Sequence, residues 1–307
     1  MNETFIAILI GTLGAGTPLV YAALGELVTE RCGVLNLGVE GMMLMGAVSA
    51  FMATAVSGNV WLGILAGILV GMAMALLFGF LTLTLQANQV ATGLALTIFG
   101  LGLSAFLGRE YVSQVVQGLP PIIIPGLSDL PILGALLFRH DALLYLSFVL
   151  FAAVSWFLYH TRAGLLLRAI GESPESGHAL GYKVIAIRYL ATLFGGAMAG
   201  LAGAYLAVVY TPMWVEGMTA GRGWIALALV VFATWKPLRV LLGAYLFGGV
   251  TILQFHVQAF GVELPSQLLS TLPYLATIVV LVLISRDATL IRLNAPASLG
   301  KTFYPGA

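Results

Sequence analysis

Residues 60–86 read VWLGILAGILVGMAMALLFGFLTLTLQ, and this stretch contains no Asp, Glu, Lys or Arg. A helix needs about 20 predominantly apolar residues to cross the roughly 30 Å hydrocarbon core of a bilayer. The stretch is long enough for that crossing, and its glycines at positions 67 and 71 fall on one helix face, where they favour tight helix packing. We therefore predict a transmembrane helix here.

The rest of the chain has the same character. Hydrophobic residues make up 60% of the 307 positions and charged residues only 8%, whereas a soluble domain has about 25% charged residues. So few charges cannot cover a water-exposed surface. The net charge of +1 also argues against nucleic acid as a partner. A single cysteine excludes an internal disulfide and a multi-cysteine metal site.

Further apolar runs lie on both sides of residues 60–86. The first run lacks a basic start, so we expect it to remain as a span and not to be a cleaved signal peptide. The run 224–235 is short and either borrows flanking residues or forms a broken element. The sequence predicts an all-α transmembrane bundle, one domain over residues 1–307, with about nine spans at 4–28, 34–56, 60–86, 90–108, 143–159, 187–210, 224–235, 240–260 and 268–284.

The basic residues predict the orientation. With the N-terminus outside, only Arg109, Arg139 and Arg222 fall in outer connections, and the other ten of the 13 basic residues fall inside. This distribution follows the positive-inside rule. We expect the N-terminus outside and the C-terminus in the cytoplasm.

Two connections are long. Residues 109–142 contain four prolines and predict an extracytoplasmic loop. Residues 160–186 form the most polar inner stretch. Ser173, Pro174 and Glu175 have the pattern of a helix start, and Gly181 that of a stop. We expect a short helix outside the bilayer; the alternative is a solvated loop without a partner.

Glu40 is the charge that we place deep in a predicted span. Such a side chain is costly in lipid and often marks a cavity or pathway. Asn36, one helical turn earlier, is expected on the same face. Glu40 either contributes to a solute pathway or makes an inter-helix hydrogen bond that holds the bundle together, and the sequence favours neither.

The outer segment 210–224 mixes glycine, proline and aromatic residues, including Trp214, Glu216 and Trp224. Tryptophans near an interface are usually anchors. A broken stretch before a short apolar run is also typical of an element that lines a translocation path. Asn88, at a span boundary, is either interfacial or part of that path.

Patterns typical of enzymes are weak. Residues 295–302 (APASLGKT) almost complete a phosphate-binding loop, but the first glycine is Ala295 and almost no chain follows to form the required helix. The four histidines have no metal-ligand spacing. We do not expect catalysis by this chain.

Three segments carry a family resemblance. Residues 31–47 (RCGVLNLGVEGMMLMGA) resemble the second-span signature of ABC importer permeases for branched-chain amino acids, ribose-type sugars and nucleosides. Residues 164–181 (GLLLRAIGESPESGHALG) resemble the cytoplasmic coupling loop of that group, and residues 210–235 resemble its nucleoside-type branch. The resemblance runs from about residue 25 to 284. Cys32, where a small residue is expected, and His178 depart from the pattern.

The resemblance implies a division of labour. This chain would form half of a pore for a nucleoside or related small polar solute in the bacterial inner membrane. A second, different and longer permease chain, two cytoplasmic ATP-binding subunits and an extracytoplasmic binding protein would complete the importer. ATP and Mg²⁺ would be used by the ATPase subunits, and this chain would carry no cofactor.

The resemblance also assigns residues. The ATPase would contact Gly171, Glu172, Ser173, Pro174, Glu175, Ala179, Leu180 and Gly181. The candidates for the solute pathway are Asn36, Glu40, Asn88, Trp214, Glu216 and Trp224. The competing hypothesis is a secondary transporter driven by an ion gradient. It predicts several ionisable groups in the membrane and does not explain the polar inner helix.

Overall fold

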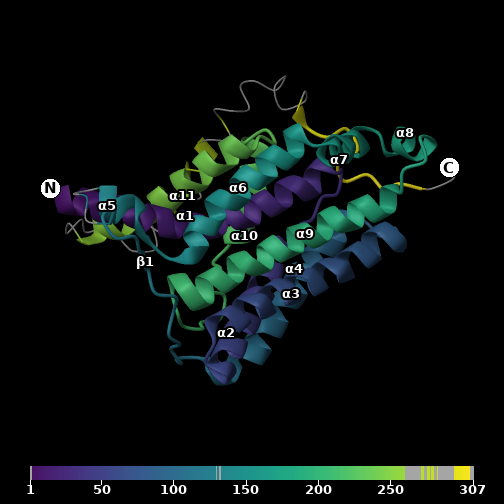
Figure 1. Cartoon of the computed structure of the whole chain (residues 1–307). Coiled ribbons are helices and arrows are strands. Elements are labelled where there is room, and N and C mark those ends of the chain that lie inside the picture. Colours follow the sequence, from purple (N-terminus) through teal and green to yellow (C-terminus); the bar gives the residue numbers. More distant parts are fainter. Residues whose placement is uncertain are drawn as a thin grey trace.

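The computed structural model describes residues 2–128, 130, 133–259, 271–272, 275–276, 278–279, 282 and 294–304 (Figure 1). Within them the chain is almost entirely helical. The elements are α1 (Asn2–Arg31), α2 (Val39–Ser57), α3 (Val60–Gly79), the π-helical turn η1 (Phe80–Thr84), α4 (Gln89–Gly108), the 3-10 turn η2 (Arg109–Tyr111), β1 (Ile122–Ile123), α5 (Leu133–Leu137), β2 (Arg139–His140), α6 (Ala142–His160), α7 (Arg162–Glu172), α8 (Pro174–Ala179), α9 (Val184–Tyr205), the π-helical turn η3 (Leu206–Tyr210), α10 (Arg222–Phe232) and α11 (Pro237–Ala259).

Seven helices of the described residues are long and apolar enough to cross a membrane. They correspond to the first six predicted spans and to the run 240–260, so these seven predictions are confirmed as helices. The run 224–235 is the short helix α10, and its flanks do not extend it to the length of a span. The ninth predicted span, 268–284, lies largely outside the described residues.

One predicted boundary is wrong. The span expected at 34–56 begins only at Val39, because the chain between α1 and α2 is held in a non-helical path. Gly33 has a φ of +88°, and the Asn36 side chain accepts a hydrogen bond from the Gly38 N–H over 2.9 Å. Such a local side-chain bond competes with helix formation.

Glycines let α3 and α9 approach closely. A Cβ on Gly71 would lie 2.3 Å from the Gly196 carbonyl oxygen, and one on Gly200 would lie 2.2 Å from that of Gly67. Both distances are shorter than any carbon–oxygen contact, so the backbones touch where a side chain would separate them. The packing role predicted from the glycine spacing is confirmed.

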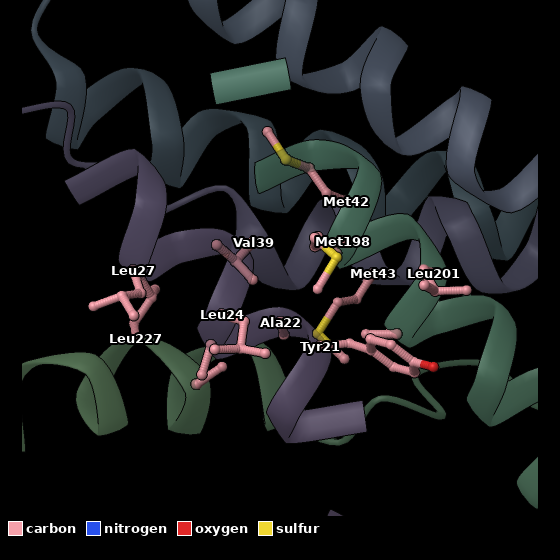
Figure 2. Packing of buried hydrophobic residues seen from close by; sticks show 14 of the residues in the cluster. Tyr21, Ala22, Leu24, Leu27, Val39, Met42, Met43, Met198, Leu201 and Leu227 are labelled. Atoms are coloured by element: carbon pink, nitrogen blue, oxygen red, sulfur yellow. The ribbon is translucent and has the colours of Figure 1, made fainter. Parts of the chain in front are cut away.

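The core lies around α1, which packs on α11, α9, α10 and α6. Figure 2 shows side chains from α1, α2, α9 and α10 meeting there, with Leu27 of α1 beside Leu227 of α10. Large apolar side chains are also exposed on α3 and α4, a surface suited to lipid; examples are Leu62, Leu65, Leu69, Ile98, Phe99 and Phe106.

The polar stretch 160–186 contains two short helices, α7 and α8. The short helix predicted after Ser173 is α8, and the Ser173 hydroxyl accepts the Ser176 N–H at its start. Gly181, with a φ of +85°, follows it. The preceding helix α7 was not predicted. Figure 1 shows α7, α8 and the C-terminus at one end of the bundle and the N-terminus at the other.

Candidate functional site

The Glu40 carboxylate joins the beginnings of two helices. It lies in the first turn of α2 and is 5% exposed. Its Oε1 accepts the Thr219 hydroxyl at 2.5 Å and the Gly221 N–H at 2.9 Å, and its Oε2 accepts the Gly223 N–H at 2.6 Å. Gly221 and Gly223 are the N-cap and the second residue of α10. Glu40 therefore caps a helix that follows it by about 180 residues.

This cap has a clear physical cause. The first N–H groups of a helix have no partner within it, and the N-terminus carries partial positive charge. Helix α10 has no side-chain cap of its own, so a carboxylate from α2 supplies the missing acceptors. Only glycine fits at position 223, because a Cβ there would lie 2.6 Å from the Glu40 Cα.

The two helix starts lie well inside the bundle. A Cβ on Gly41, the residue after Glu40, would lie 2.8 Å from the Thr97 Cα, and Gly100 packs on the same glycine. Thr97 and Gly100 are near the middle of α4. Helices that begin within the membrane, where backbone groups can face a cavity, are a recurrent feature of transporter binding sites.

Asn36 does not share a helix face with Glu40, and that expectation is wrong. It precedes α2, is fully buried and donates its backbone N–H to Glu26 Oε1 over 3.1 Å. Its side-chain oxygen accepts the Gly38 N–H. Asn36 therefore shapes the connection between α1 and α2.

The other pathway candidates are spread over the molecule. Trp214 is fully buried in the connection between η3 and α10, against Gly108 at the end of α4. Glu216 is exposed, and Trp224 is 37% exposed on α10 one residue after Gly223. Asn88 is exposed and accepts the Ala91 N–H as the N-cap of α4. We call Glu40 together with its partners Thr219, Gly221 and Gly223 the Glu40 junction. Of the four candidates above, only Trp224 directly follows one of these residues in the chain.

The structure adds two buried carboxylates, Glu26 and Glu30, that are not among the candidates from the sequence. Glu26 falls inside the predicted span 4–28. Glu26 and Glu30 of α1 are each 1% exposed. The Trp235 indole N–H donates to Glu30 Oε2 over 2.5 Å, and Arg31 donates to the Trp235 carbonyl oxygen at 2.8 and 3.2 Å. Glu30 and Arg31 thus tie the end of α1 to the turn between α10 and α11. Glu26 and Glu30 are four residues apart on a mostly apolar helix, so they lie on one helix face, and this spacing is the sequence signal for the buried pair.

The eight predicted coupling residues differ in solvent exposure. Gly171 and Pro174 are buried, and Ser173 is half-buried. The remaining five are exposed: Glu172, Glu175, Ala179, Leu180 and Gly181. Leu180 is 77% exposed at the tip of the α7–α8 pair. No group of three or more His, Cys, Asp or Glu side chains suited to a metal ion occurs in the described residues.

Comparison with known proteins gives consistent matches along the chain. The family described as "Branched-chain amino acid transport system / permease component" matches residues 8–284. The Haloferax volcanii protein named "Putative glucose ABC transporter permease protein TsgC13" is 44% identical over 96% of this chain and 97% of its own length. The nucleoside ABC transporter permease protein NupC of Lactococcus lactis is 32% identical over 92% of this chain and 93% of its own.

One solved structure supports the fold. It is described as "An inward-facing conformation of a putative metal-chelate type ABC transporter" and superposes with a TM-score of 0.50. The alignment covers 90% of this chain and 84% of that chain at 16% identity. A likeness at this identity shows the arrangement of helices and carries no information on the solute.

Proposed function

Because the chain belongs to the permease family of ABC transporters described above, we propose that it forms half of the pore of an importer for a nucleoside or a related sugar-like solute. Members of the family are membrane permease subunits and not catalytic chains. We further propose an inner membrane location with the N-terminus outside, a second and longer permease chain, and two ATPase subunits that use ATP and Mg²⁺. A separate extracytoplasmic protein would bind the solute first.

The observation that carries the proposal is the exposed tip of the α7–α8 pair. Leu180 and Tyr182 are 77% and 46% exposed beside Glu175 and Lys183, outside the seven long apolar helices. Tyrosine is enriched among the residues that carry most of the binding energy at protein interfaces, and exposed apolar side chains rimmed by charged ones mark such interfaces. We infer that this tip docks on an ATPase subunit, so that nucleotide binding there favours one state of the pore.

The proposed solute path passes the Glu40 junction. We propose that the exposed face of α10, including Trp224, borders this path, and that Glu40 acts by holding α10 in place. Trp214, Glu216, Asn88 and Asn36 remain weaker proposals for the path. Substrates named for relatives include glucose and nucleosides, and both present a hydroxyl-rich ring to hydrogen-bonding groups.

Co-purification and energetics test the assembly. The chain expressed with its neighbouring genes is expected to purify with an ATPase subunit, and uptake in vesicles is expected to stop when ATP is removed but to persist when ion gradients are collapsed. Uptake that follows the ion gradient would instead establish the secondary-transporter alternative. Isothermal titration of the associated binding protein with a nucleoside and with glucose would identify the solute class.

A single substitution tests the docking surface. Leu180→Asp places a charge at the proposed interface and is expected to abolish uptake while this chain still folds. Val56→Asp is the matched control, since Val56 is a 78% exposed apolar residue in the last turn of α2, away from the proposed solute path. Glu172 is unsuitable, because its Oε2 accepts the Ala297 N–H over 3.3 Å within the chain. Normal uptake by Leu180→Asp would remove the docking proposal.

A further inference from the structure

Residues 294–304, which include the stretch that resembles a phosphate-binding loop, pack against the end of α7. We call them the C-terminal segment. Ser298 is 4% exposed, and its N–H and hydroxyl donate to the Gly171 carbonyl oxygen over 3.0 and 2.7 Å. Arg188, the fifth residue of α9, donates to the same hydroxyl over 3.0 Å. One serine therefore links the end of α7 to α9.

The same segment contacts the connection between α1 and α2. The Gly300 N–H donates to the Gly33 carbonyl oxygen over 3.2 Å. A Cβ on Gly33 would lie 2.3 Å from the Ser298 Oγ and 2.9 Å from Arg188 Nη2. Because Gly33 has no side chain, the α1–α2 connection, the C-terminal segment and α9 can come into contact here. Arg31 adds a hydrogen bond to the Asn294 carbonyl oxygen over 3.1 Å.

The segment also reaches α8. The ring of Phe303 lies 5.7 Å from that of His178, edge to face, and Phe303 is only 7% exposed. His178 is itself exposed on α8. The segment therefore contacts α7, α8, α9 and the α1–α2 connection, and its residues 295–304 form no helix.

We propose that the C-terminal segment is a positioning element that transmits movement of α8 to the α1–α2 connection and so to the Glu40 junction. This inference rests on the proposed docking of α8 on an ATPase. Gly33 precedes Glu40 by only seven residues, and the chain between them is buried or half-buried. A displacement at Gly33 is thus passed to the start of α2, where Glu40 holds α10.

The experiment uses the assembled transporter in proteoliposomes and compares Phe303→Ala, His178→Ala and their combination. Tyr304→Ala is the matched control, because Tyr304 is a neighbouring aromatic residue that is 53% exposed. We expect uptake per ATP hydrolysed to fall about tenfold in Phe303→Ala, with assembly and basal hydrolysis unchanged; this corresponds to about 1.4 kcal/mol of lost bias between pore states.

Labelling of Cys32 with a thiol reagent distinguishes a segment that transmits movement from one that only stabilises the fold. Cys32, beside Gly33, is fully buried. If the segment transmits movement, the rate at which a maleimide labels Cys32 should differ between nucleotide-free and ATP-trapped transporter. That difference should disappear in Phe303→Ala. Labelling that is independent of nucleotide in the wild type overturns the inference.

The double variant separates the two ways in which His178 could act. If the losses of uptake per ATP in the two single variants do not add up in the double variant, His178 acts through its contact with Phe303. If they do add up, His178 contacts the ATPase directly, which contradicts the inference. Loss of assembly in Phe303→Ala together with normal coupling in His178→Ala also contradicts it. If Leu180→Asp abolishes uptake while both variants behave as wild type, the positioning role fails and the docking proposal stands.

Discussion

The replacement Glu40→Gln isolates the charge of the buried carboxylate while keeping its shape. The amide oxygen can keep the Thr219 and Gly221 bonds, but the amide NH₂ then faces the Gly223 N–H, which loses its acceptor. An unsatisfied buried N–H costs about 1–3 kcal/mol. Removing negative charge from each of two helix N-termini costs about 0.3–1 kcal/mol more. Relief of the carboxylate's desolvation offsets part of this cost, which leaves a loss of about 2–3 kcal/mol.

For a chain of this size such a loss lowers the melting temperature by roughly 5 °C or more. Size-exclusion chromatography after heating, with the chain fused to a fluorescent protein, measures the shift in detergent. Glu216→Gln is the control, since Glu216 is an exposed acid in the connection before α10. We expect no shift for it. A melting temperature for Glu40→Gln within about 1 °C of wild type, combined with lost uptake, would refute the capping argument and make Glu40 a solute contact.

Three further expectations concern packing, capping and reactivity. Gly200→Leu should prevent the approach of α9 to α3 and abolish folded yield on size-exclusion chromatography, whereas Gly102→Leu, where a Cβ meets nothing within 4 Å, should fold normally. Asn88→Ala should lower stability by about 1 kcal/mol in thermal melts, with Asn88→Ser close to wild type, because Asn88 is an N-cap; a KM for uptake that changes in both variants would place Asn88 on the solute path. Burial raises the pKa of the Cys32 thiol to about 12, so maleimide at pH 7.5 should label the nucleotide-free protein slowly and the denatured protein fast, as mass spectrometry can show.

The parts of the fold that sequence predicts well are those with a local cause. Apolar runs longer than a bilayer crossing marked seven helices, and Ser173 followed by Pro174 marked α8, because a cap and its helix are adjacent in the chain. Helix α7 also has a local signal, the Thr161 hydroxyl that accepts the Gly164 N–H. Because the stretch 160–186 is polar overall, this single cap does not by itself predict α7.

The candidate site was less predictable because its partners are remote. Nothing near Glu40 in the sequence indicates that its acceptors are needed by Gly221 and Gly223, about 180 residues later. The C-terminal segment has no helical periodicity, and its burial arises from Ser298 and Phe303 meeting other parts of the chain. Such roles follow only from tertiary contacts.

Asn36 offers a decisive comparison between a pathway residue and a structural one. Asn36→Ala leaves the buried Gly38 N–H without an acceptor, which costs about 1–3 kcal/mol. Asn36→Asp restores an acceptor but places a second carboxylate beside Glu26, which already accepts the Asn36 N–H. Burial away from water destabilises the charged form of a carboxyl group, so the aspartate variant should melt below wild type although its side chain has nearly the same shape. If both variants melt as wild type and alter only the KM for uptake, Asn36 contacts the solute and the connection is held by other groups.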